Sequence, residues 1–197
     1  MAKKPLFNPN ESGLHIVMDS TEDLVKAIAL LTKNEVLVGF PEETTDRDDP
    51  ASAALGITNA ALGYIHDNGA PEQHIPARPF MEPGMARAVD DVTDTLARAA
   101  EYALASKPEM TAKGFDQAGL QAVKGIQTVI REGIAPALAD STLRARAAKG
   151  RKGAAKELGR RERGLAPGMF GAIPLMDTNE MLKSVSYVVR NRNQRGK

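Results

Sequence analysis

Residues 83–106 (PGMARAVDDVTDTLARAAEYALAS) and residues 111–133 (TAKGFDQAGLQAVKGIQTVIREG) decide the fold that this sequence predicts. In both stretches, apolar side chains return every three or four residues, which is the spacing of one face of an α-helix. They are Met85, Val89, Val92, Leu96, Ala99 and Ala103 in the first stretch, and Phe115, Leu120, Val123, Ile126 and Ile130 in the second. Pro83 suits a first helical turn, and Pro108 stops the first helix. We therefore expect two long helices joined by a short connection.

Three glycines, Gly114, Gly119 and Gly125, interrupt the second stretch. Each lowers helix stability by up to ~1 kcal/mol relative to alanine. Close packing against another backbone would explain them, because glycine leaves room for a neighbouring segment to approach.

Shorter elements flank the two long helices. Apolar, β-branched runs predict strands at residues 14–18, 35–39 and 184–189. A short helix is expected to follow Ser20, which can cap it, with an apolar face at Leu24, Ala27, Ile28 and Leu31. A second short helix is expected from Asn59 to about His66, and a capped helical turn over residues 177–182. Residues 74–79 (HIPARP) should be extended, since residues before proline avoid the α region.

This order of elements predicts an α+β fold, in which a small, mostly antiparallel sheet is packed by two long helices and carries long polar loops. We expect an extended arm at residues 1–13, a single domain at 14–189 and a basic tail at 190–197. Within the domain, we expect an acidic loop at 41–57 and a basic excursion at 144–168.

Composition excludes some classes of chemistry. The 197 residues contain no Cys, which excludes disulfides, thiolate metal sites and Cys nucleophiles, and fits a reducing cytoplasm. The net charge of +1 gives no global attraction to nucleic acid or membrane. We expect no signal peptide and no membrane span, because no apolar stretch is long enough.

Two segments of the sequence concentrate charge of one sign, which indicates that any electrostatic contact with a partner is local. Between residues 144 and 163 the chain has nine basic and two acidic side chains and no apolar face, so we expect a solvated excursion outside the core. Its Arg151, Lys152, Arg160 and Arg161 could instead contact the acidic loop of a neighbouring subunit or DNA. The carboxylates available in that loop are Glu42, Glu43, Asp46 and Asp48, together with Asp49.

No pattern of catalytic or metal-binding residues emerges. The three histidines, His15, His66 and His74, are isolated, so we expect no metal, no cofactor and no catalytic site. His66 followed by Asp67 suggests a hydrolase only weakly, because a histidine at a helix end beside a turn is the commoner situation.

Four segments carry a resemblance to a known family. They are VLVGFP at 36–41, ALGYIHDNGAP at 61–71, IPARPFM at 75–81 and PLMDTNEMLKSV at 174–185. In this order they resemble the tail-completion, tail-terminator and virion-morphogenesis proteins of tailed bacteriophages. Those families usually have Gly where this chain has Asn179, and Asn also tolerates a left-handed backbone.

The resemblance implies a tail-terminator-like fold and a structural protein rather than an enzyme. It implies a homo-oligomeric ring, with six subunits favoured, at the top of the tail in the neck of the virion. Its partners would be the tail tube protein and head-completion or connector proteins, with genome DNA in the lumen as a further candidate. The interface and structural residues it indicates are Tyr64, His66, Arg78, Pro79, Phe80, Asp177, Thr178 and Leu182.

The strap at residues 75–80 has a physical interpretation that agrees with this role. Its two prolines stiffen it, Phe80 can anchor it in the core, and Arg78 is a fork-shaped donor suited to a carboxylate nearby or across an interface. Alternatives remain open: a head-closure or head–tail adaptor protein of the neck, and a nucleic-acid-binding module that uses residues 144–163.

Overall fold

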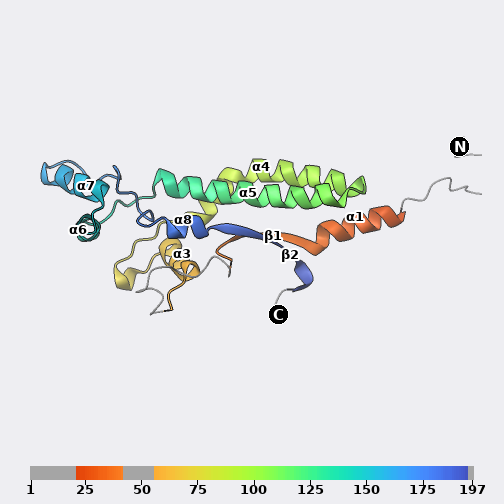
Figure 1. The fold of residues 1–197 in the computed structure, drawn as a ribbon, viewed down its shortest axis with the longest axis horizontal. Helices are drawn as coiled ribbons and strands as arrows, with labels where there is room; N and C mark the ends of the chain where they lie inside the picture. Colours follow the sequence, from red (N-terminus) through yellow and green to blue (C-terminus); the bar gives the residue numbers. More distant parts are fainter. Residues whose placement is uncertain (1–20, 42–55, 195–197) are drawn as a thin grey trace, which may run out of the picture.

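The structure is a computed structural model that describes residues 21–41 and 56–194. The expected arm, the strand at 14–18 and almost all of the acidic loop, with Glu42, Glu43, Asp46 and Asp48, lie outside the described residues. The described chain is elongated (Figure 1), with helix α1 (Thr21–Lys33) toward one end and helices α6 (Asp140–Ala148) and α7 (Lys152–Glu162) at the other.

A helical hairpin forms the body of the molecule. Helix α4 (Met81–Leu104) and helix α5 (Pro108–Glu132) pack along their lengths, as the sequence predicts, with both N-terminal ends about two or three residues earlier than expected. Close packing explains two glycines: a Cβ on Gly125 would lie 2.4 Å from the carbonyl oxygen of Gly84, and a Cβ on Gly114 would lie 2.6 Å from the Ala99 Cβ.

This close approach corrects part of the expected buried face of α4, of which Ala99 and Ala103 are buried as predicted. Its buried side is made of small residues, Gly84, Ala88, Thr95, Ala99 and Ala103. The larger apolar residues lie on an adjacent, open side, where Val89 is 51% exposed. We call Met85, Val89 and Leu96, all exposed, the open stripe of α4. On α5, Leu120 is likewise exposed rather than buried.

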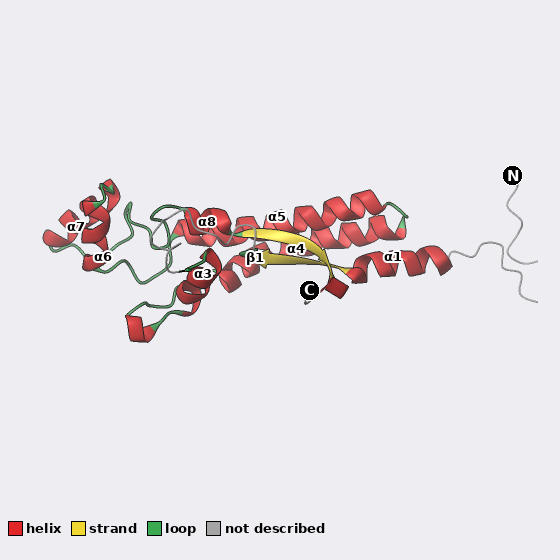
Figure 2. Cartoon of the chain, turned by 60° about the horizontal axis from the view of Figure 1, so that its bottom comes forward, coloured by secondary structure: helices red, strands yellow, loops and turns green. Residues whose placement is uncertain are grey.

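A two-stranded antiparallel sheet covers one side of α5 (Figure 2). Strand β1 (Asn34–Gly39) pairs with strand β2 (Ser186–Asn191), with Val36 opposite Val189 and Val38 opposite Tyr187. The ring of Tyr187 lies against Gly119, where a Cβ would approach it to 2.3 Å. The α+β class is therefore confirmed, while the expected tail begins later, because Arg190 belongs to β2 and pairs with Glu35 at 3.0 Å.

Short elements complete the main body. They are α3 (Asn59–Asn68), the 3-10 turns η2 (Pro71–Gln73) and η3 (Arg192–Gln194), and α8 (Glu180–Ser184). Thr58 caps α3, and its side-chain oxygen accepts a hydrogen bond from the Ala61 amide at 3.1 Å. Asn179 has a left-handed backbone, with φ of 64°, as its side chain allows. Helix α1 forms as expected, but its Leu24 and Ile28 are exposed.

The main core gathers where these elements meet. Its buried members are Phe80, Ile126, Ile130, Met181, Leu182 and Val185. Phe80 is completely buried and meets the ring of Phe40 edge-on, with centroids 6.3 Å apart. Phe80 therefore lies in the core, where the sequence places it, and its role as an anchor of the strap stays a prediction.

The basic excursion is the largest departure from expectation. Helices α6 and α7 pack on each other and enclose a second core of Leu138, Leu143, Ala154 and Ala172. The side chain of Glu157 has no exposed surface in this unit and binds Arg160 at 3.2 Å and Arg161 at 3.1 Å. The segment lies outside the main core, as predicted, but the prediction that it has no apolar face is wrong, because the fold brings Leu143, Ala154 and Leu158 together.

No helix in the described part of the chain is long and apolar enough to cross a membrane. The same residues include no group of three or more His, Cys, Asp or Glu side chains placed to bind a metal ion.

Candidate functional site

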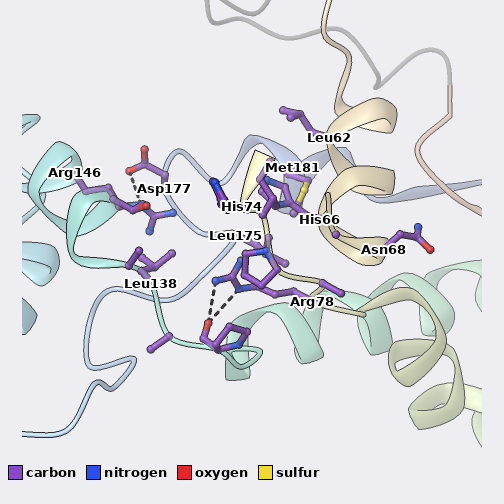
Figure 3. Close-up of a pocket in the computed structure, with 18 of the residues that line it drawn as sticks. Leu62, His66, Asn68, His74, Arg78, Leu138, Arg146, Leu175, Asp177 and Met181 are labelled. Atoms are coloured by element: carbon purple, nitrogen blue, oxygen red, sulfur yellow. Dashed lines mark hydrogen bonds and ion pairs between the residues drawn. The ribbon is translucent and has the colours of Figure 1, made fainter. Parts of the chain in front are cut away.

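A cavity of 780 Å³ lies where the main core meets the α6–α7 unit (Figure 3). Its walls come from α3, the strap, residues 136–146, the loop before α8, and α8 itself. Polar groups in the wall include His66, Arg78, Arg146 and Asp177. Apolar wall residues include Leu62, Ile75, Leu138, Leu175 and Met181.

Arg78 is the most deeply placed cation in the wall. The residue is 6% exposed, and its Nε and Nη2 atoms both donate to the carbonyl oxygen of Pro136, at 3.3 and 3.0 Å. Burial, and then the positive charge of Arg146, lower the pKa of Arg78. Among the described residues, a carbonyl thus takes the place of the expected carboxylate partner. That oxygen orients the guanidinium but does not neutralise its charge.

Arg146 enters the cavity from α6. Its Nη1 atom donates to the carbonyl oxygens of Ile173 at 3.1 Å and Met176 at 3.5 Å. Its Nε atom lies 3.9 Å from Asp177 Oδ1, an atom that Arg151 Nε approaches more closely, at 3.0 Å. Asp177 is therefore shared between two arginines, and the group as a whole is positive.

His66 projects from α3 toward the same two arginines. Its backbone oxygen accepts a hydrogen bond from the Arg78 amide at 2.8 Å, which ties the strap to the helix. Its Nδ1 atom is buried and has no hydrogen-bond partner among the described residues. Burial first, then the charges of Arg78 and Arg146, lower the pKa of His66 below its ordinary value. The imidazole is consequently neutral at neutral pH.

Asp67 has a structural task that the sequence did not reveal. Its Oδ1 atom accepts hydrogen bonds from the amides of Phe80 at 2.7 Å and Met81 at 3.0 Å. Those amides begin α4, so a carboxylate from α3 caps α4 and complements the positive end of its dipole. Asp67 thus accepts hydrogen bonds from the backbone amides at the start of α4, and it is not positioned as a partner for the His66 ring.

The other residues singled out from the sequence are scattered around this site. Thr178 lines the cavity and Leu182 belongs to the main core, whereas Tyr64 is 71% exposed outside the cavity wall. Pro79 is an exposed residue of the strap. In the basic unit, Arg160 and Arg161 bind Glu157, Arg161 also binds Asp140 at 2.6 Å, and Lys152 begins α7 at the surface.

Sequence reasoning missed Arg146 and Pro136 as parts of the site, and Glu157 as the centre of the basic unit. Nothing local marks the first two, because their partners lie tens of residues away. Glu157 did have a local signal. It stands three and four residues before Arg160 and Arg161, which is the spacing of helical ion pairs.

The neutral state of His66 predicts a pH dependence of stability. Because its pKa is lower in the folded chain than in the unfolded one, the unfolded chain binds more protons below the ordinary value of 6.5. The free energy of unfolding should therefore fall as the pH drops below 6.5 toward the folded value. Urea unfolding across this pH range should show a shallower decline for His66→Gln than for the native chain.

The matched control is His74→Asn, which removes an exposed imidazole and suits the left-handed backbone at that position. Its pH profile should match that of the native chain. The charged groups around His66 are Arg78 and Arg146, and the nearby carboxylates Asp67 and Asp177 are bound elsewhere. Parallel profiles for His66→Gln and the native chain would contradict the assignment.

In comparisons with known proteins, no protein-family model, curated protein or solved structure matches this chain.

Proposed function

We propose that this chain is a structural protein of a tailed-bacteriophage virion, of the tail-completion or tail-terminator type. In this role, copies of the chain assemble in the host cytoplasm into a closed ring, with six subunits favoured. The ring caps the tail tube at the neck and joins it to the head-completion or connector proteins. Heterologous contacts between identical subunits give such rings when the rotation closes.

The observation that carries the proposal is the meeting of the four resembling segments in one place. Phe40 packs on Phe80, and Asp67 caps the helix that starts at Met81. Met181, Leu182 and Val185, from the fourth segment, lie in the same core as Phe80. Segments far apart in the sequence thus form one continuous unit, which supports reading them as a single family signature rather than as chance matches.

Exposed apolar side chains support the assembly part of the proposal. The open stripe of α4 leaves Met85, Val89 and Leu96 uncovered by the described chain, and Leu24 and Val25 of α1 are also exposed. A soluble monomer seldom leaves several large apolar side chains uncovered on one helix face, and such surfaces commonly mark protein contacts.

The two alternatives receive different support. A head-closure or adaptor role would use the same unit and the same exposed stripe of α4. A nucleic-acid-binding role is less favoured, because Arg146, Arg160 and Arg161 are engaged within the chain. DNA binding would have to rely on exposed groups such as Arg144, Lys149 and Lys152.

We expect Val89→Glu to abolish ring formation without changing the fold. Val89 is half exposed, so the substitution should change the free energy of unfolding by only about 0.5 kcal/mol. The matched control is Arg98→Glu, which places the same side chain on the opposite side of α4, two and a half turns further on. Sedimentation and electron microscopy should show rings for the native chain and for Arg98→Glu, and smaller species for Val89→Glu.

The virion role has its own test. A label fused to the C-terminus should mark a rotationally symmetric ring at the neck of intact particles in electron micrographs. A subunit located outside any such ring would contradict the proposal, even if the purified chain forms rings in solution.

A further inference from the structure

The cavity beside Arg78 holds positive charge that the described chain does not neutralise. Of the wall residues that the structure describes, Asp177 is the one carboxylate, and it faces Arg146 and Arg151 together. Arg78 is nearly fully buried, and among the described residues its only hydrogen-bond acceptor is the Pro136 carbonyl. A buried charge is ordinarily paired, so two guanidinium groups sharing so little negative charge point to a missing anion.

Donors remain free to bind that anion. A guanidinium has five N–H groups, and the two hydrogen bonds to Pro136 occupy two of those on Arg78, leaving its Nη1 amino group. His66 also lines the cavity, and its buried Nδ1 atom is a second polar group without a hydrogen-bond partner among the described residues. Figure 3 shows the side chains of Arg78, Arg146 and His66 converging on the cavity from three different segments.

The rest of the wall determines the kind of anion. Leu62, Ile75 and Leu175 line the same cavity, so a ligand needs an apolar part beside its charge. The volume of 780 Å³ suits a few amino-acid residues rather than one small ion. Duplex DNA is a poor fit, because its phosphates lie on a broad hydrated surface, whereas the Arg78 guanidinium is recessed.

We propose that this cavity binds an acidic peptide segment of a protein partner, with a Glu or Asp carboxylate received by Arg78 and Arg146 and a neighbouring aliphatic side chain packed on the apolar wall. Arginine suits this task, because its planar donors match the two oxygens of a carboxylate. The neutral imidazole of His66 lies beside these two arginines in the cavity wall. The inference is independent of ring formation and holds whether or not the chain belongs to a phage neck.

The test is a binding titration of the full chain with two blocked peptides, acetyl-Leu-Glu-Leu-amide and acetyl-Leu-Gln-Leu-amide. The Glu peptide should bind about 10–100-fold more tightly than the Gln peptide, because a charge-assisted hydrogen bond is stronger than a neutral one. Binding should move the NMR resonances of His66 and raise the pKa of its imidazole, since a carboxylate offsets the charges of Arg78 and Arg146.

Substitutions locate the site. Arg146→Gln should weaken binding of the Glu peptide about tenfold or more, and Arg146→Lys, which keeps the charge, should restore part of it. Arg144→Gln is the matched control, because Arg144 lies on the same helix but is exposed and outside the cavity wall. It should bind as the native chain does, and thermal melting of each variant checks that it is folded.

Three results would overturn the proposal. One is equal affinity for the two peptides, or no binding of the Glu peptide to the native chain at millimolar concentration. Another is an equal loss of binding in Arg144→Gln and Arg146→Gln, which would indicate a diffuse basic surface. The third is displacement of the peptide by a short DNA duplex with loss of the His66 shift, which would make the cavity a phosphate site.

Discussion

Phe80→Ala is expected to lower the free energy of unfolding by about 3–5 kcal/mol, which is the usual cost of truncating a fully buried aromatic side chain. Phe80 has no exposed surface and packs with Phe40, Ile126 and Leu182 in the main core. It also stands at the start of α4, where Asp67 accepts a hydrogen bond from its amide. Equilibrium denaturation followed by circular dichroism measures the loss.

The matched control is Phe170→Ala. Phe170 is 61% exposed, and its ring lies under the guanidinium of Arg160, with 4.4 Å from the Arg160 Cζ atom to the ring centroid. Its removal should cost about 0.5–1 kcal/mol, the value of an exposed cation–π contact. If Phe80→Ala unfolded at the same denaturant concentration as the native chain, Phe80 would not be the anchor of the strap.

Glu157→Ala is the second large effect we expect. Three donors converge on this carboxylate: Arg160, Arg161 and the amide of Gly168, the last at 2.7 Å. Burial by itself would raise the pKa of Glu157, but the hydrogen bonds from Gly168, Arg161 and Arg160 outweigh it and hold the pKa below its ordinary value. The carboxylate is therefore charged in the folded chain at neutral pH.

Removing the Glu157 carboxylate leaves its three donors without their shared acceptor, a kind of loss that costs about 3–5 kcal/mol when the pair is buried. The loss should be local, because Glu157 lies in the α6–α7 unit and not in the main core. Hydrogen exchange should accelerate across residues 140–162, while α4 and α5 keep their protection.

Glu162→Ala is the matched control, because it removes an exposed carboxylate from the same helix. We expect its exchange pattern to match that of the native chain. Uniform acceleration over the whole chain in Glu157→Ala would show instead that the α6–α7 unit and the main core unfold together.

The two expected effects bear on the candidate site, because the cavity lies between the units they test. His66 and Arg78 come from the side of the main core, and Arg146 comes from α6. Hydrogen bonds connect these segments. Arg78 donates to the carbonyl oxygen of Pro136, and Arg146 donates to the carbonyl oxygens of Ile173 and Met176. Glu157→Ala should accordingly weaken binding of the acidic peptide, since it loosens the helix that positions Arg146.

The sequence by itself determined the local structure of much of this protein. The apolar spacing of residues 83–106 and 111–133 placed both long helices, and the β-branched runs placed both strands of the sheet. The sequence also indicated that Phe80 is buried in the core. Phe80 is a large aromatic residue that directly follows a segment stiffened by two prolines, and such a segment holds the position of the next side chain. These features depend on neighbours within a few residues, and such neighbours are visible in the sequence.

Only the tertiary structure decided which faces are buried and which partners the charges take. Periodicity identified an apolar face on α4, but Gly84, Ala88 and Gly125 let the two helices approach so closely that Val89 is left outside. Arg78 donates hydrogen bonds to the carbonyl oxygen of Pro136, which lies 58 residues further along the sequence. Glu157, on α7, is buried because α6, α7 and the loop at Gly168 pack around it. Packing distance and long-range pairing depend on contacts between remote segments, and no local pattern of residues encodes them.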